Sequence, residues 1–455
     1  MEAVSAKVLL KGLWAGAPAG LTITNVVTDS REVTPGCLFV AIKGERVDGH
    51  DFAAGAFENG AALVLASRPV EGLPPDRTVL VPDVLDAMIR MGANYRAQYS
   101  PLVLGVTGSV GKTSTKEFCA AIFSAFGETL KTEGNQNNEI GLPKTLFKMN
   151  DDTRYAVIEM GMQGPGEIRK LSFAAAPDGA IITRIGMMHL EQMGSLENIL
   201  RAKLEVSEGI ASGGVLILNG DDPLLRGAAV PQGLQVVYAG PENPENEVRA
   251  KNVRHEAHGL VFEIVDARYG NTEAFIPAVG RHNVGNALLA YTAATRFGLG
   301  AQQAAAALAA YLPAGARQKV ETIREVTVIE DFYNAGPDSM AAALDTLGEM
   351  ATGGRRIAVL GNMLELGAVS EEQHRRLGRL AQKAGVDLLL TVGDLAALAA
   401  EEAAKLGLKT LPCASNAEVA ALLWEKTRPG DLLLLKASRG MKFEEILELF
   451  SEAPE

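Results

Sequence analysis

A short glycine-rich stretch contains the residue types of a phosphate-binding loop. It follows the apolar run 102–106 and reads Gly108-Ser109-Val110-Gly111-Lys112-Thr113-Ser114. The two glycines allow successive backbone N–H groups to point at a polyphosphate, at the positive end of the next helix. Lys112 can pair with the terminal phosphates, and the Thr113 hydroxyl can ligate Mg²⁺. The stretch therefore predicts a site for a nucleoside triphosphate, although the strict P-loop motif has glycine where Val106 stands.

Polar residues also follow other apolar runs that we predict as strands around this loop. Glu159 directly follows one run, His189 comes after a second, and residues 219–222 follow a third. In a parallel sheet such positions meet at the ligand-binding edge. Glu159 suits the acidic ligand of a nucleotide-bound Mg²⁺, with a helix N-cap or a surface carboxylate as the alternative. For His189 a buried, hydrogen-bonded histidine is the alternative.

Two amide-rich segments could hydrogen-bond a polar ligand. The loop 132–143 contains Asn137 and Asn138 among other amides and glycines, and a plain surface loop is the alternative. Further on, Asn283 and Asn286 open a predicted helix and could reach the edge of an adenine. Ordinary N-capping by Asn283 stays open as the other interpretation.

Near the N-terminus, four polar residues could bind a diphosphate and a sugar. They are Ser30, Arg31, Lys43 and His50, and arginine and lysine are the usual partners of anions in proteins. Taken singly, each is also compatible with an ordinary surface or capping role.

Composition limits the function classes. The chain has 455 residues, 47% of them hydrophobic, and a formal net charge of −12, so we expect about three domains. No dense run of Lys and Arg offsets the negative charge, which argues against general nucleic-acid binding. Cys37, Cys119 and Cys413 show neither disulfide nor zinc spacing. No stretch approaches the ~18 apolar residues of a membrane span, so we expect a cytoplasmic protein.

The order of apolar runs predicts an α/β fold in three domains. Residues 1–98 read as a small α/β domain, 99–311 as a parallel sheet with helices on both faces, and 312–455 as a doubly wound, Rossmann-like domain. The segment 312–317 reads as a linker. No Gly-x-Gly-x-x-Gly motif is present, which disfavours NAD. The predicted strands are 38–42, 61–65, 102–106, 155–158, 179–182, 215–218, 326–330, 357–360, 388–392 and 432–435.

Taken together, these motifs resemble the Mur ligase family over nearly the whole chain. Four stretches are most similar to the branch of the family that adds a D-alanyl-D-alanine dipeptide: 48–52 (DGHDF), 135–141 (NQNNEIG), 333–340 (YNAGPDSM) and 360–367 (LGNMLELG). The family's ATP loop is short, which accounts for the missing first glycine.

The resemblance implies a reaction in the synthesis of the peptidoglycan precursor of the cell wall. ATP would phosphorylate the terminal carboxylate of UDP-MurNAc-tripeptide, and the amine of D-alanyl-D-alanine would displace phosphate from the acyl phosphate to form a peptide bond. Because anionic groups meet in such a site, it needs Mg²⁺ and fixed cations. The resemblance implies two Mg²⁺ ions and small-molecule partners, and we expect a monomer.

The resemblance also assigns roles to residues. Lys112 would hold the β- and γ-phosphates, and the metal ligands would be Thr113, Glu159, His189 and Lys203, the last as a carbamylated lysine. By itself Lys203 reads as a solvated helix lysine. The other assignments are Asn283 and Asn286 at adenine; Arg317 and Asp331 near ribose and phosphate; Ser30, Arg31, Lys43, His50, Asn137 and Asn138 at the UDP substrate; and Tyr333, Asn334, Ser438 and Arg439 facing the substrates.

The chain departs from the family pattern at three positions. Ala437 stands where glycine is usual, Gly336 where asparagine is usual and Asn362 where aspartate is usual. The second change removes a side-chain amide and the third removes a charge.

Two other functions remain open from the sequence. One is a related ligase that adds a single amino acid, either to a UDP-MurNAc-dipeptide or to folate polyglutamate. The other is a nucleotide-dependent switch without ligation, although Glu159, His189 and Lys203 are more metal machinery than a switch requires. In the ligase we expect the C-terminal domain to close about a hinge at 313–317.

Overall fold

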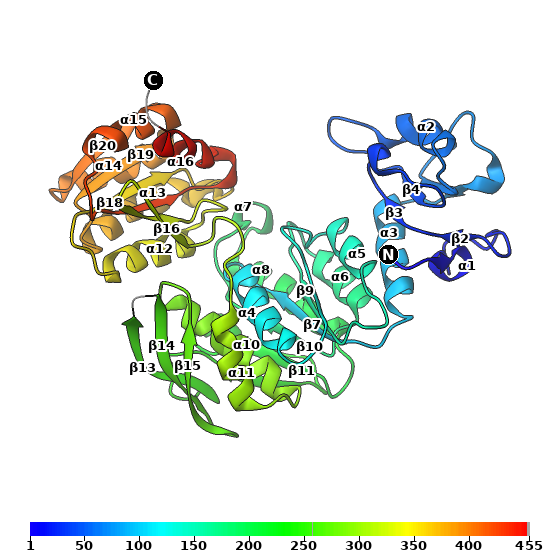
Figure 1. Ribbon diagram of the computed structural model, residues 1–455, viewed down its shortest axis with the longest axis horizontal. Helices are drawn as coiled ribbons and strands as arrows, with labels where there is room; N and C mark the ends of the chain where they lie inside the picture. The colour runs from blue at the N-terminus through cyan, green and yellow to red at the C-terminus, as the bar shows by residue number, and fades with distance from the viewer. Residues whose placement is uncertain (257, 453–455) are drawn as a thin grey trace.

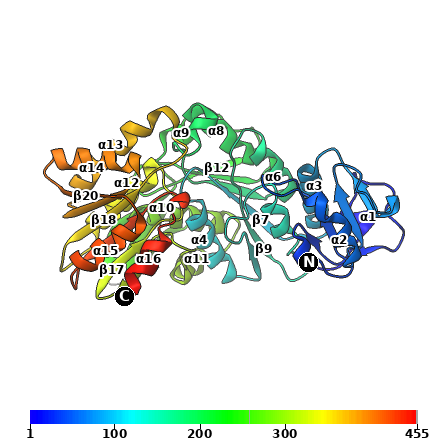
Figure 2. The same ribbon diagram turned by 90° about the horizontal axis from the view of Figure 1, so that it is seen from above.

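Separate β-sheets organise three successive parts of the chain (Figure 1). The computed structural model describes residues 1–256 and 258–452. The three parts lie in a row, with the central one between the other two, and Figure 2 shows the same row from above. Across these described residues, no helix combines the length and hydrophobicity that crossing a bilayer requires.

The N-terminal part contains a short parallel sheet in the order β3-β4-β5-β6. The strands β4 and β5 confirm two predicted strands. A small antiparallel ladder, β1–β2, packs beside it. The elements are β1 (Val4–Ser5), α1 (Ala6–Leu9), β2 (Thr22–Ile23), β3 (Val26–Val27), η1 (Ser30–Glu32), β4 (Leu38–Val40), η2 (Gly49–Phe52), α2 (Ala53–Glu58), β5 (Leu63–Ala66), η3 (Pro75–Arg77), β6 (Thr78–Leu80) and α3 (Val84–Arg96).

The central sheet has the strand order β15-β14-β13-β12-β11-β10-β7-β9-β8. Its strands are β7 (Leu102–Thr107), β8 (Thr129–Lys131), β9 (Tyr155–Glu159), β10 (Gly179–Ile182), β11 (Val215–Asn219), β12 (Gln235–Ala239), β13 (Val248–Glu256), β14 (Gly259–Asp266) and β15 (Gly270–Ile276). The strands from β8 to β13 pair in parallel, but β13, β14 and β15 pair antiparallel. The predicted parallel sheet is confirmed for these strands, but it continues at one edge in antiparallel strands that were not predicted, where a turn at Gly270 (φ 81°) joins β14 and β15.

Helices cover both faces of the central sheet. Alternate residues of β7 point to opposite faces: Val103 packs in one core with α5 and α6, and Leu104 packs in the other with α4 and α10. The helices are α4 (Lys112–Ser124), α5 (Gly141–Leu146), α6 (Glu167–Ala175), α7 (Leu190–Met193), α8 (Leu196–Leu204), η4 (Glu205–Gly209), α9 (Pro223–Arg226), α10 (His282–Arg296), α11 (Ala301–Ala307) and η5 (Leu308–Ala310).

The C-terminal part is a doubly wound sheet in the order β16-β17-β21-β18-β19-β20, and among its described strands only β16 and β17 pair antiparallel. Its elements are β16 (Lys319–Ile323), β17 (Val326–Glu330), α12 (Pro337–Glu349), β18 (Arg356–Gly361), η6 (Gly367–Val369), α13 (Ser370–Lys383), β19 (Leu388–Val392), α14 (Asp394–Lys405), β20 (Lys409–Cys413), α15 (Asn416–Lys426), β21 (Leu432–Lys436), η7 (Arg439–Met441) and α16 (Glu444–Ser451). The sequence predicted the inner strands but missed the edge strands β16 and β20, which are less apolar.

Candidate active site

A cavity of about 520 Å³ lies at the carboxyl ends of β7, β9 and β10. Its wall combines the glycine-rich loop and the amide loop of the central part with residues that follow β17 and β21. Sixteen predicted site residues line it: Gly108, Ser109, Val110, Gly111, Lys112, Thr113, Ser114, Asn137, Asn138, Glu159, His189, Lys203, Arg317, Asp331, Tyr333 and Asn334. These residues are distant in sequence but lie together because the carboxyl ends of parallel strands meet at one edge of the sheet.

The glycine-rich loop needs its glycines for backbone reasons. Gly108 has φ 142° and Gly111 has φ 82°, which are left-handed values that other residues rarely adopt. A Cβ on Gly111 would also lie 2.7 Å from Asn286 Oδ1. The helix α4 starts at Lys112, whose Nζ donates to the Gly108 carbonyl at 2.9 Å. The lysine therefore lies over the loop, and burial lowers its pKa.

Glu159 is a buried carboxylate at the end of β9, so the alternatives of a helix N-cap and a surface carboxylate are wrong. Its Oε2 accepts from the Thr113 hydroxyl at 2.9 Å, and its Oε1 accepts from Asn137 Nδ2 at 2.8 Å. Its backbone N–H donates to Thr132 Oγ1 at 3.0 Å. The geometry therefore presents a hydroxyl and a carboxylate together, with Asn137 orienting the carboxylate.

Lys203 is 2% exposed, so its interpretation as a solvated helix lysine is wrong. Burial, and secondarily the charge of Lys112, lowers the pKa of Lys203 well below its ordinary value. A buried cation without a close counter-ion is costly. Hydrophobic residues of α8 that pack in the core hold Lys203 at this wall of the cavity.

His189 precedes α7 in a left-handed conformation (φ 62°) and faces the C-terminal part of the chain. Its Nδ1 lies 2.9 Å from Glu365 Oε2. The two groups are close enough for an ion pair, but their orientation is not that of a hydrogen bond. Burial lowers the pKa of His189, partly opposed by Glu365. The alternative of a fully buried and hydrogen-bonded histidine does not describe it.

The donor set can be tested for Mg²⁺. Among the described residues, no group of three His, Cys, Asp or Glu side chains converges enough to hold a metal by itself. Thr113 and Glu159 nonetheless present hard oxygen atoms, and Mg²⁺ commonly combines one or two such ligands with substrate phosphates and water. The residues therefore fit a metal that arrives with a nucleotide.

The segment 183–189, which ends at His189, is held from both sides. Ser109 Oγ accepts from Gly186 N at 2.9 Å on the side of the glycine-rich loop. On the other side, Asn219 Nδ2 donates to Thr183 O at 2.9 Å and Asp222 Oδ2 accepts from Ile185 N at 2.8 Å.

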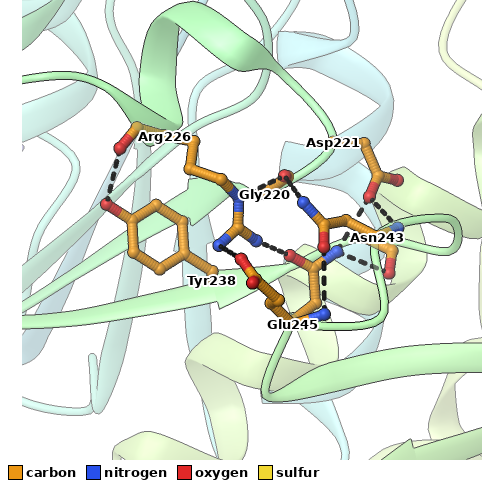
Figure 3. A network of polar contacts seen from close by, with 8 residues as sticks. Gly220, Asp221, Arg226, Tyr238, Asn243 and Glu245 are labelled. Atoms are coloured by element: carbon orange, nitrogen blue, oxygen red, sulfur yellow. Dashed lines mark hydrogen bonds and ion pairs between the residues drawn. The ribbon is translucent and has the colours of Figure 1, made fainter.

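The carboxylate of the neighbouring Asp221 belongs to a second polar network (Figure 3). Its carboxylate accepts from Glu242 N, Asn243 N and Asn246 Nδ2 at 2.7 to 3.0 Å. In the same network, Arg226 donates to Gly220 O at 3.0 Å and its guanidinium lies 4.7 Å from the Tyr238 ring centroid.

The residues after β17 and β21 supply the opposite wall. Lys436 Nζ is buried and lies 2.8 Å from Asp331 Oδ2. Burial raises the pKa of Asp331, and the Lys436 charge opposes that shift. The Arg317 guanidinium lies 3.5 Å from the centroid of the Tyr333 ring, a cation–π contact. The resemblance pointed to the stretch 436–440, which begins with Lys436, as facing the substrates, whereas Gln318 carried no sequence signal and was missed.

The four N-terminal candidates do not line this cavity. His50 is buried, with Nδ1 2.6 Å from Asp48 Oδ1 and Nε2 accepting from Ser67 N. Arg31 pairs with Asp29 on the surface. Ser30 starts η1, and Lys43 forms an isolated antiparallel β-bridge with Asp48. Their roles at a UDP group stay predictions.

Four further candidates are not part of the cavity lining. Asn283 and Asn286 are buried within α10, which starts at His282, so Asn283 is not the N-cap. Asn283 donates to Gln318 Oε1 at 3.0 Å, and Asn286 Oδ1 accepts from Thr115 at 3.3 Å. Ser438 Oγ accepts from Leu364 N at 3.1 Å, while Arg439 is exposed near Tyr333. Their predicted contacts with adenine and substrates stay untested.

Comparison with known proteins gives the class. Residues 22–98 match the Mur ligase family catalytic domain, 106–294 the Mur ligase middle domain and 317–439 the Mur ligase glutamate ligase domain. The chain belongs to the Mur ligase family.

Three similar proteins are named as a particular ligase within this family. The UDP-N-acetylmuramoyl-tripeptide–D-alanyl-D-alanine ligase of Bacillus subtilis is 39% identical over 451 residues, 98% of this chain and 97% of that protein. A crystal structure of MurF from Acinetobacter baumannii matches with a TM-score of 0.91 and 30% identity over 100% of both chains. MurF ligase from Thermotoga maritima, in complex with ADP, matches with a TM-score of 0.84 and 28% identity over 94% of this chain and 97% of that chain.

Proposed function

We propose that this chain is an ATP-dependent ligase that joins D-alanyl-D-alanine to UDP-MurNAc-tripeptide and forms UDP-MurNAc-pentapeptide. One observation carries the proposal: a single cavity joins a phosphate-binding loop, a hydroxyl–carboxylate pair and a buried lysine to residues of a second sheet. The names of the similar proteins from Bacillus subtilis and Acinetobacter baumannii support the same activity.

In the first step the tripeptide carboxylate attacks the γ-phosphorus of ATP, and ADP leaves with the electron pair of the broken P–O bond. The N–H groups of residues 108–113 and the Lys112 ammonium would hold the phosphates. They would stabilise the negative charge that develops on ADP as it leaves. In the second step the dipeptide's ammonium group gives a proton to solvent, and the neutral amine attacks the carbonyl carbon. Phosphate leaves with the electron pair of the broken C–O bond, and the nitrogen gives its second proton to the departing phosphate or to solvent. Holding the reactants ~3 to 3.5 Å apart is the main task of the protein.

Mg²⁺ would bind at Thr113 and Glu159, where it neutralises phosphate charge. A second Mg²⁺ would use His189 and Lys203 after Lys203 reacts with CO₂. In that reaction a C–N bond forms, the nitrogen loses a proton to solvent and an anionic carbamate results. The low pKa of Lys203 supports this modification because the neutral amine is the form that reacts.

We also propose three domains: 1–98 for the UDP group, 99–311 for ATP and 312–455 for the dipeptide. Each range contains its own sheet. The domains would act within a monomer, in the cytoplasm where ATP is supplied. The segment 313–317, which lies between η5 and β16, would serve as the hinge.

The test measures phosphate release from Mg²⁺–ATP with UDP-MurNAc-tripeptide, with and without D-alanyl-D-alanine. Release that requires all substrates, together with a UDP product heavier by the dipeptide residue mass, would establish the ligase. Release that follows a single amino acid would identify another Mur-type ligase. Release that ignores both would leave a nucleotide hydrolase.

A further inference from the structure

The stretch 360–367 presents two side chains outward beside the cavity. Leu364 and Glu365 are exposed, whereas the flanking Met363 and Leu366 are buried in the core under β18. Glu365 has φ 63°, a left-handed conformation that a residue with a Cβ adopts at a cost. The loop therefore holds the Glu365 side chain exposed, away from the C-terminal sheet, and the left-handed backbone at this residue is strained.

Hydrogen bonds to three other segments anchor the loop and hold Glu365 in this conformation. Met363 N donates to the buried His374 Nε2 at 2.9 Å, and Leu364 N donates to Ser438 Oγ at 3.1 Å. Asn362 Oδ1 accepts from Ala396 N at 2.8 Å, which ties the loop to the start of α14. The Glu365 carboxylate is thus positioned before any ligand binds.

The Glu365 carboxylate contacts a residue of the central part that lines the cavity. Its Oε2 lies 2.9 Å from Nδ1 of His189, which lines the cavity, and its side chain is 48% exposed. No hydrogen bond with full geometry reaches it from the described residues. By contrast, Glu159 is held by Thr113 and Asn137, and Asp331 is held by Lys436.

Charges of both signs line the cavity. The cations are Lys112, Lys203, Arg317 and Lys436, and the carboxylates are Glu139, Glu159, Glu167 and Asp331. Asp331, the carboxylate that follows β17 in the C-terminal part, is paired with Lys436, whose charge repels an incoming ammonium group. Beside the cavity, on the same C-terminal side, Glu365 adds an exposed carboxylate that no hydrogen bond from the described residues holds.

We propose that Glu365 binds the ammonium group of the incoming dipeptide, with the exposed Leu364 side chain beside it for the first methyl group. This inference rests on the proposed ligase function and adds to it a residue that determines specificity for a free amino terminus. Glu365 leaves His189 when the amine arrives, so the same carboxylate serves two contacts in turn.

The experiment compares Glu365→Gln with Glu191→Gln. Glu191 also lies at this domain interface, against Gly367, and loses the same charge. Two ligands are used: D-alanyl-D-alanine as substrate, and D-lactyl-D-alanine, which has a hydroxyl in place of the amine, as competitive inhibitor. An ion-paired hydrogen bond contributes ~10- to 100-fold in affinity.

Glu365→Gln is expected to raise KM for D-alanyl-D-alanine at least about tenfold. It should leave Ki for D-lactyl-D-alanine, KM for ATP and the Mg²⁺ dependence of nucleotide binding within about twofold, and Glu191→Gln should change none of them. Equal weakening of both dipeptide ligands, or a change confined to Mg²⁺ dependence, would overturn the inference. If the wild-type chain itself ignores the dipeptide, the proposed function fails instead.

Discussion

Two loops at the same edge of the central sheet are alike in sequence and opposite in chemistry. Both follow an apolar strand and contain glycine beside polar residues: 108–113 after β7 and 220–222 after β11. Around the first, the half-buried Lys112 and the buried Lys203 line the cavity, and neither forms an ion pair with a carboxylate of the described residues. Around the second, Asp221 saturates its acceptors within the protein (Figure 3).

Polar residues after a strand occur at any edge of a parallel sheet, whereas polar groups without protein partners occur where a ligand binds. Saturated networks stabilise the fold, so their loss should lower stability more than activity. Groups left without partners cost stability and are retained for a ligand, so their loss should have the reverse effect.

The largest expected effect comes from Lys203→Met. Ligation should slow by about 10³-fold or more because the cavity loses its second proposed metal-binding group. The midpoint of thermal unfolding should stay equal or rise, since an uncompensated buried amine is replaced by an apolar chain of similar length. Steady-state ligation and differential scanning calorimetry measure the two quantities. A fall in stability that matches the fall in activity would contradict the comparison.

The opposite pattern is expected for Asp221→Ala. Donors from Glu242, Asn243 and Asn246 lose their acceptor, which should cost about 2 kcal/mol of stability. The lower unfolding midpoint should be visible in calorimetry, while kcat stays within about twofold at 25 °C. If ligation fell as much as in Lys203→Met, the network in Figure 3 would belong to the site.

Asp222→Asn should fall between these two. An asparagine has a single acceptor oxygen, so it can cap Leu224 N and Leu225 N or hold Ile185 N, but it cannot do both. The segment that leads to His189 should loosen, and the affinity for Mg²⁺–nucleotide should fall about three- to tenfold, as for one lost hydrogen bond.

Calorimetric titration and amide hydrogen exchange at Ile185 test this prediction, with Asp221→Asn as the matched control. The control should lose stability but keep both the nucleotide affinity and the protection of Ile185. Equal nucleotide affinities in the two variants would show that Asp222 merely caps α9.

The sequence alone predicted the parts of this arrangement that depend on local order. Apolar runs separated by helices gave the three α/β sheets, and strand ends gave Lys112, Glu159 and His189. It could not predict that Asp221 is satisfied and Lys203 buried, because those properties depend on partners from other elements. The antiparallel edge β13–β15 was missed because the pattern of the first strands was extended over the whole domain.

The role of His50 shows the same limit. Its motif DGHDF suggested a ligand contact, but in the structure the ring joins Asp48 to Ser67 through both nitrogens. A histidine with partners on each nitrogen resembles Asp221 more than Lys203, although its part at a UDP group remains a prediction.

The smallest effect is expected at Asn362, where the family usually has aspartate. The side chain accepts from Ala396 N in the first turn of α14, so it acts as a cap from a neighbouring loop. Asn362→Asp keeps the acceptor and places a negative charge at the positive end of the helix, which should add about 0.5 kcal/mol. Asn362→Ala should instead remove about 1 kcal/mol.

Thermal unfolding midpoints in low salt measure both changes, because salt screens the charge effect. Ligation rates should stay within about twofold for Asn362→Asp, since its contacts lie behind the loop that presents Glu365 and not in the cavity. A larger gain in rate would mean that the aspartate itself reaches a substrate. Position 362 would then belong with the unsatisfied groups of the site, and the division between the two kinds of loop would extend into the C-terminal sheet.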